Sequence, residues 1–254
     1  MIFDRIVCGV DGTPEGFEAA RQAALLALPE SELRLVEVVN PGDAAPAGVA
    51  VTVSVTELED EARETLGRTL GEITPVHLAE GTMLEGRPIP SLLSELERDQ
   101  ATLLVVGIHR RSRIGGILTA SVATTMLHDA PCSVLIARAS ADPERFPSSI
   151  VVGVDGSPAS GRALEAARQV AERFGAGLHG LVAHSPGAPG VEQVRGALGE
   201  VPLLEDPRHP VAALVAAAAD LLVVGSRGLH GLRALGSVSE QVAHQAACSV
   251  LVVR

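Results

Sequence analysis

The residues best suited to chemistry in this chain lie near its C-terminus, in the stretch GSRGLHGLRALGSVSEQ. Gly225 ends an apolar run and would let a ligand approach without a Cβ in the way, and Gly228 would permit positive φ in a turn. Gly236 and Ser237 then open a predicted helix, whose free amide groups and dipole favour an anion. Together these residues predict a phosphate cradle that needs no lysine.

Part of this stretch also has a purely structural explanation. Ser237 and Glu240 have the spacing of a capping box, which stabilises a helix with no ligand present. Gly228 alone is equally compatible with an ordinary turn. The sequence leaves both interpretations open.

An aspartate ends the first apolar run of each half, in IVCGVDGTP and again in IVVGVDGSP. The hydroxyl that follows, Thr13 or Ser157, precedes a proline and is expected to cap a helix. Asp11 and Asp155 are then not needed as caps. At the carboxyl end of a parallel strand, we expect each carboxylate to face a ligand or a bound cation.

The elements that position these residues occur twice. LLVVG recurs, and CSVLIAR near the middle of the chain returns as CSVLVVR at its end. Three matched blocks in the same order predict two homologous domains. The predicted domains are residues 1–139 and 149–254, and the predicted linker is residues 140–148.

Each half alternates apolar runs of strand length with helical periodicity, which predicts βαβ units, a parallel sheet and an α/β fold. Strands of the first half are expected at Arg5–Val10, Glu32–Val39, Pro75–Ala79, Thr102–Ile108 and Ser133–Arg138. Helices are expected at Glu15–Ala27, Val55–Ile73, Ile89–Arg98 and Ser121–His128. The second half repeats this order more briefly, and its second helix shrinks to Val191–Leu198.

Composition excludes several functions. All 20 basic residues are arginine, so neither a phosphate loop with its lysine nor a Schiff base is available. The net charge of −11 argues against nucleic acid and anionic membranes as partners. Aromatic residues make up 2% of the chain, so base stacking is nearly excluded and the core must consist of Val, Leu, Ile and Ala.

The cysteines and histidines predict no metal site. Cys8, Cys132 and Cys248 lie in apolar runs and are expected to be buried, and their spacing fits a reducing cytoplasm. The eight histidines have no zinc-binding spacing. We expect no signal peptide, because a strand begins at the N-terminus, and no membrane span, because no apolar run reaches about 20 residues.

On these motifs, both halves resemble the universal stress protein family, and the chain is similar to a tandem member. The family pattern is an Asp after the first strand, then G-x2-G-x9-G-[S/T] after the fourth. The resemblance implies two Rossmann-like (adenine nucleotide alpha hydrolase-like) five-stranded parallel-sheet domains in tandem. It also implies ATP binding where the pattern is kept and pairing through the last strands, here Val134–Ala137 against Val250–Val253.

The second half keeps the pattern, with seven residues instead of nine between the last two glycines. The resemblance therefore implies a nucleotide site there, with the adenine against the end of the second strand near Val182. The implied site residues are Asp155, Val182, Gly225, Gly228, Gly236 and Ser237.

The first half departs from the pattern because Arg110 replaces the second glycine and Ala120 the third. Arg110 either closes the site or, with Arg111 and Arg113, clamps phosphate in place of main-chain amides. We favour a degenerate site. Its remaining candidates are Asp11, Val38, Gly107, Arg110 and Ser121.

The sequence thus predicts a cytoplasmic stress protein that binds ATP, AMP or ADP, with or without Mg²⁺, and acts as a nucleotide-dependent regulatory module. An interaction protein without nucleotide and a slow ATPase are the alternatives. No catalytic residues are predicted, and an ATPase would have no group except Asp155 to orient the attacking water. Association of two chains into a homodimer is left open.

Overall fold

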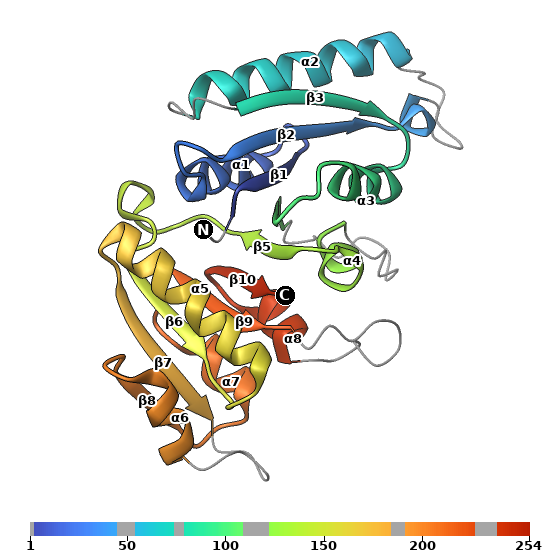
Figure 1. Cartoon of the computed structure of the whole chain (residues 1–254). Helices are drawn as coiled ribbons and strands as arrows, with labels where there is room; N and C mark the ends of the chain where they lie inside the picture. The colour runs from blue at the N-terminus through green and yellow to red at the C-terminus, as the bar shows by residue number, and fades with distance from the viewer. Residues whose placement is uncertain (1–2, 45–53, 74–78, 109–121, 184–190, 227–237) are drawn as a thin grey trace. The chain divides into compact units, whose positions relative to one another are not determined.

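Strands and helices alternate along the chain in the computed structural model, which describes residues 3–44, 54–73, 79–108, 122–183, 191–226 and 238–254 (Figure 1). The strands are β1 Arg5–Val10, β2 Glu32–Val39, β3 Ala79–Glu85, β4 Leu103–Gly107, β5 Ser133–Ala137, β6 Ser149–Gly153, β7 Gly177–Ala183, β8 Leu203–Asp206, β9 Leu221–Gly225 and β10 Ser249–Val253. The helices are α1 Pro14–Leu26, α2 Val55–Glu72, α3 Pro88–Arg98, α4 Val122–Asp129, α5 Pro158–Phe174, α6 Val191–Leu198, α7 Pro210–Val215 and α8 Val238–Gln245. Short 3-10 turns lie at Pro41–Ala44 and Pro143–Arg145.

The chain divides into two compact units between Cys132 and Ser133. In unit 1, which ends at Cys132, parallel strands lie in the order β3-β2-β1-β4. Gly81 of β3 faces Leu66 and Leu70 of α2. Arg34 of β2 instead forms ion pairs with Glu95 of α3 and with Asp99, the C-cap of that helix. Because neighbouring residues of a strand point to opposite faces and Gly81 is paired with Leu35, α2 and α3 cover opposite faces of this sheet.

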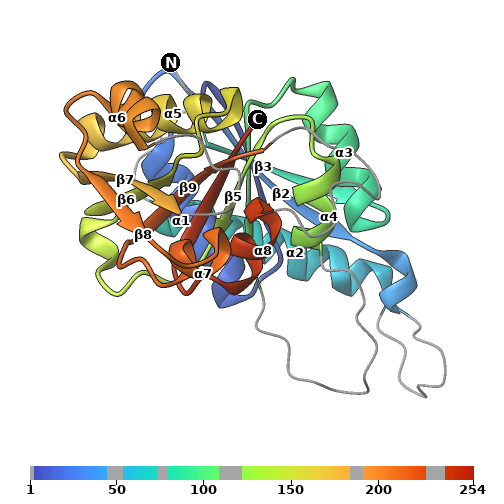
Figure 2. The same ribbon diagram turned by 90° about the horizontal axis from the view of Figure 1, so that it is seen from below.

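Unit 2, which begins at Ser133, has the strand order β5-β10-β9-β6-β7-β8. All neighbours from β10 to β8 are parallel, and β5 joins β10 antiparallel. Figure 2 shows α5 and α6 on one side of β6 and β7, and α7 and α8 on the other. Two glycines support this arrangement. Gly153 faces Leu214 of α7, whereas Gly180, which is paired with the preceding residue Val152, faces Leu198 of α6.

The predicted pairing of the two last strands is confirmed. Leu135 of β5 lies opposite Leu251 of β10. The hydroxyl of Ser249 accepts from the amide of Arg138 at 3.0 Å and donates to its carbonyl at 3.2 Å. By sequence β5 belongs to the first half, but it packs within unit 2. The domain boundaries read from the repeat therefore differ from the division by packing, and they remain a prediction.

Helix starts follow from local sequence. Thr13 and Ser157 are the N-caps of α1 and α5, and each precedes a proline, as predicted. Ser54 caps α2 in a full capping box with Glu57. Gly175, at φ +61°, ends α5 in the left-handed conformation that glycine adopts most easily.

The core consists mainly of Val, Leu, Ile and Ala, as the composition predicted, but Phe3, Phe146 and Met126 are buried in it as well. The most deeply buried large side chains include Leu35, Leu104, Ile136 and Leu221, each exposed by 0%. Cys8 is fully buried, and burial raises the pKa of its thiol far above the usual range. Cys132 is also buried, but Cys248 is only partly so, which corrects the expectation that all three are buried.

Most predicted elements of the first half are present, but the third strand was misplaced. We expected it at Pro75–Ala79, and β3 instead runs over Ala79–Glu85, while residues 74–78 lie outside the described residues. β3 is an edge strand and no residue of it is fully buried, so it lacks the apolar run by which strands were recognised. Within the described ranges, no helix combines the length and hydropathy required to cross a bilayer.

Candidate functional site

Asp11 and Asp155 lie just beyond the carboxyl ends of β1 and β6, and both are exposed. The Oδ1 atom of Asp155 accepts from the amide of Ser157 at 3.0 Å, and Oδ1 of Asp11 accepts from the amide of Thr13 at 3.3 Å. Gly12 and Gly156, which follow the aspartates, have φ near +70° and +72°. As expected, the helix caps are Thr13 and Ser157 and not these carboxylates, but each carboxylate also holds its own turn.

The capping hydroxyls complete these turns. Thr13 Oγ1 accepts from the amide of Gly16 at 3.1 Å, and Ser157 Oγ accepts from the amide of Ser160 at 3.2 Å. In each half, a hydrogen-bonded turn therefore connects the strand to the first turn of the following helix and fixes the position of the carboxylate. The two turns share these hydrogen bonds but differ in detail. The hydroxyl of Thr13 also donates to Oδ1 of Asp11, whereas in the second half the hydroxyl of Ser160 donates to the carbonyl of Ser157 at 3.0 Å.

Gly107 ends β4, the neighbour of β1, and Gly225 ends β9, the neighbour of β6, and packing requires both glycines. A Cβ on Gly225 would lie 2.3 Å from the carbonyl oxygen of Ala159 in α5. A Cβ on Gly107 would lie 2.5 Å from the carbonyl oxygen of Glu15 in α1. Close contact between strand end and helix therefore explains these glycines, whereas the sequence analysis assigned Gly225 to the approach of a ligand.

Three predicted residues come together in unit 2. β6 lies between β9 and β7 and runs parallel to both. Gly225, Asp155 and Val182 therefore lie at the same edge of the sheet, the one formed by the carboxyl ends of the strands. The chain leaves β6 toward β7 on one side and returns to β9 on the other. This is the reversal of strand order at which open α/β sheets bind ligands.

In unit 1, Gly107, Asp11 and Val38 occupy the corresponding edge, on β4, β1 and β2. The strand register, however, shows that Val38 is not the counterpart of Val182. Gly9 is paired with Val36 and Gly153 with Leu181, so Glu37 takes the place of Val182. Val38 corresponds to Ala183. The side chain of Val182 is 2% exposed, which leaves mainly its main chain available to a ligand.

Glu37 gives the edge of unit 1 an unusual electrostatic character. Its Oε2 atom is buried and has no hydrogen-bond partner among the described residues. Burial, reinforced by the charges of Asp11 and Glu61, raises the pKa of Glu37 to about 7, and Arg68 opposes this shift. Glu37 is not among the predicted site residues, although a charged residue inside the apolar run of β2 is a signal visible in the sequence.

The remaining predicted site residues lie outside the described residues, and they include most of the proposed phosphate loop. They are Gly228, Gly236 and Ser237 in the second half, and Arg110 and Ser121 in the first. Across the described ranges, no group of three or more His, Cys, Asp or Glu side chains is arranged to hold a metal ion.

Comparison with known proteins supports one family assignment. The family model described as the universal stress protein family matches residues 2–138 and 205–254. The universal stress protein Rv2623 of Mycobacterium tuberculosis is 30% identical over 286 residues, covering 98% of this chain and 96% of its own length.

Solved structures support the same fold. A universal stress protein from Archaeoglobus fulgidus superimposes with a TM-score of 0.78 at 23% identity, covering 98% of this chain and 96% of its own. A universal stress protein in complex with cAMP covers 55% of this chain and 100% of its own at 23% identity, with a TM-score of 0.44. That ligand is a property of that protein, and a match at this score supports no inference about the present chain.

Proposed function

The chain belongs to the universal stress protein family, and from this premise we propose that it binds an adenine nucleotide in its second half and acts as a nucleotide-dependent regulatory module. One observation carries the proposal. Asp155 is an exposed carboxylate held in a fixed turn at the point where strand order reverses between β6 and β9. Beyond β9 the sequence continues into the glycine-rich stretch with Gly228, Gly236 and Ser237.

The two edges differ in a way that favours the second half. Val182 is an apolar residue near the end of β7, where the base is expected to lie against the main chain. In the first half the same position holds Glu37, a half-buried carboxyl beside Asp11. Burying a further polar ligand next to two acidic groups costs free energy unless each group finds a partner. The retained glycines at 228 and 236 point to the same half.

Mg²⁺ fits this proposal only as a companion of the nucleotide. The carboxylate of Asp155 is a hard oxygen ligand of the kind that Mg²⁺ prefers. Because three potential metal-binding side chains do not gather anywhere in the described part of the chain, phosphate oxygens and water would supply most ligands. The role of Asp155 is then to orient a cation that the phosphates bring with them.

An interaction protein without nucleotide is the second candidate, and a specific observation favours it. Gly107 and Gly225 are both required by strand–helix packing, so these two glycines need no ligand to explain them. A slow ATPase has no comparable support among the described residues.

Calorimetric titration of the full chain with ATP and Mg²⁺ tests the proposal. Asp155→Asn keeps an oxygen for the amide of Ser157 while removing the charge, and Asp11→Asn is the matched control in the first half. We expect Asp155→Asn to weaken ATP binding about fivefold or more, because the charged carboxylate that coordinates Mg²⁺ is lost. We expect Asp11→Asn to have little effect on ATP binding. Absence of heat from the wild type would instead favour the interaction protein.

Phosphate release by the same preparations tests the ATPase. We expect the wild type to release phosphate from ATP no faster than Asp155→Asn or buffer alone. Turnover that disappears in Asp155→Asn would favour the enzyme instead.

A further inference from the structure

We infer that Arg162 of α5 is the cation that meets the phosphate groups of a nucleotide bound by the second half. The inference rests on the proposed function and adds a residue outside the glycine-rich stretch. It follows from where the guanidinium lies, from the residue that replaces it in the first half, and from the chemistry of arginine.

Arg162 lies at the same edge of the sheet as Asp155. Val152 of β6 is paired with Val223 of β9, so Asp155 and Ser226, three residues further along each strand, reach the same level. The Nη2 atom of Arg162 donates to the carbonyl oxygen of Ser226 at 3.3 Å. The guanidinium is therefore held beside the carboxyl end of β9, next to the first turn of α5.

Most of this guanidinium is available to a ligand. Arg162 is exposed, and within the described ranges the Ser226 carbonyl is its only hydrogen-bond partner. A guanidinium has five N–H donors in a planar fork, and this contact occupies one of them. The other donors suit bidentate binding of phosphate oxygens.

The first half carries the opposite charge at this position. Glu18 is the fifth residue after the cap Thr13, as Arg162 is the fifth after Ser157. Burial confirms the correspondence of the two helices, since Gly16, Ala19, Ala20, Gln22, Ala23 and Leu26 match buried Ser160, Ala163, Leu164, Ala166, Ala167 and Val170. Glu18 is held by Arg21 and Gln22, each with a nitrogen 2.6 Å from its Oε1.

The presence of Glu18 in one half and Arg162 in the other gives the two corresponding segments different net charges. From Asp11 to Glu18 the chain has three acidic and no basic residues, whereas from Asp155 to Arg162 it has one of each. The segment charge is therefore −3 in the first half and zero in the second. A polyanion is repelled less at the second edge, and a chain without lysine must use arginine for this purpose.

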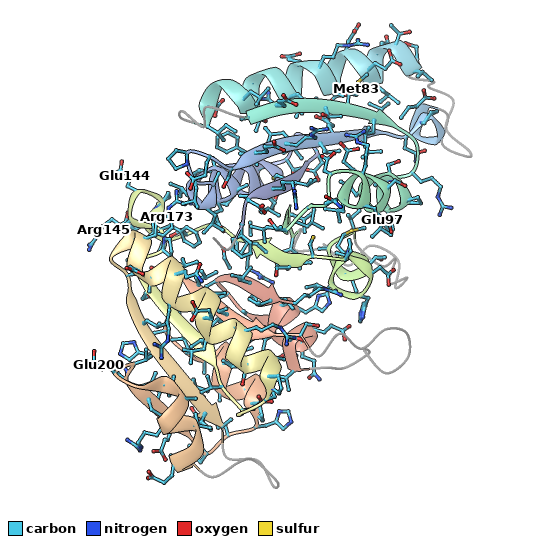
Figure 3. All side chains as sticks on the ribbon, in the orientation of Figure 1. Met83, Glu97, Glu144, Arg145, Arg173 and Glu200 are labelled. Atoms are coloured by element: carbon cyan, nitrogen blue, oxygen red, sulfur yellow. The ribbon has the colours of Figure 1, made fainter. Side chains whose placement is uncertain are left out.

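The test measures affinity of the full chain for adenosine, AMP and ATP without divalent cations, using Arg162→Ala. The control is Arg173→Ala, which removes the same charge from the carboxyl end of the same helix (Figure 3). We expect Arg162→Ala to weaken the binding of ATP about tenfold or more, because each charge-assisted phosphate contact is lost. The binding of AMP is expected to weaken less. The affinities of Arg162→Ala and of the wild type for adenosine are expected to agree within twofold. Arg173→Ala is expected to bind all three ligands with the affinity of the wild type.

Three results would overturn the inference, and they can be told apart from failure of the proposed function. ATP affinity of Arg162→Ala within twofold of the wild type would show that the guanidinium does not meet phosphate. An equal loss for adenosine and ATP would show that Arg162 acts on the fold of the site, as would an equal loss in Arg173→Ala. If the wild type binds none of the three ligands, the proposed function itself fails, and the inference with it.

Discussion

Gly225→Ala is expected to destabilise the protein through a collision that the structure locates. The new Cβ would lie 2.3 Å from the carbonyl oxygen of Ala159 and 2.9 Å from the amide nitrogen of Ser160. Non-bonded carbon contacts are comfortable only beyond about 3.5 Å, so β9 and α5 must separate by roughly 1 Å. Overpacking of this kind costs about 1–3 kcal/mol.

Gly161→Ala is the matched control, because it adds the same methyl group to the same end of α5. A Cβ at Gly161 meets nothing within 4 Å, and Gly161 is exposed. Replacing a glycine inside a helix by alanine stabilises by about 0.5–1 kcal/mol. The two variants should therefore shift stability in opposite directions.

Urea unfolding followed by far-ultraviolet circular dichroism is the suitable assay, since the chain has no Trp or Tyr to report by fluorescence. We expect the midpoint of unfolding to fall for Gly225→Ala and to rise for Gly161→Ala. An unchanged midpoint for Gly225→Ala would refute the argument that packing against α5 requires glycine there, and would return Gly225 to a role in ligand approach.

Two further predictions concern the dependence of stability on pH. Because the pKa of Glu37 is raised from 4.5 to about 7 in the folded protein, stability should fall as pH rises from about 4.5 through 7. Glu37→Gln should flatten this decline and be more stable than the wild type at pH 8, by roughly 1–2 kcal/mol after solvent screening; equal unfolding midpoints at pH 5.5 and 8 in the wild type would contradict this. Burial alone would raise the pKa of Asp220, but hydrogen bonds from Ser148 and Ser149 outweigh it and lower the pKa, so the stability that Asp220 contributes should disappear as pH falls below about 4. Asp220→Ala should cost about 1.5–3 kcal/mol at pH 7, and urea midpoints equal to those of the wild type at neutral pH would count against it.

The α/β class and the repeat could be predicted because they depend on local patterns. The pairing of the last strands joins distant segments and was predicted from the family resemblance. Apolar strands such as β4 and β9 share the letters LLVVG and are buried alike. β3 was misplaced because an edge strand does not need an apolar run. The position of β3 is fixed by its pairing with β2, for example of Met83, labelled in Figure 3, with Glu37, and the sequence of β3 alone does not reveal this pairing.

The candidate site was predictable only in part, since its properties depend on contacts between distant segments. The turns at Asp11 and Asp155 follow from a few adjacent residues. The equivalence of Val182 with Glu37 follows from strand register instead, and the packing of Gly225 from the approach of α5. Arg162 becomes notable only when its guanidinium is found beside Ser226, 64 residues away.

Native mass spectrometry of the full chain with ATP tests the central claim most directly, because it counts the nucleotides bound to each chain. The informative variant is Gly228→Arg, which gives the second half the residue that the first half carries at Arg110. We predict one nucleotide per wild-type chain, one per Arg110→Ala chain and none per Gly228→Arg chain. A wild type that binds none, or a Gly228→Arg variant that still binds one, would contradict a nucleotide site in the second half.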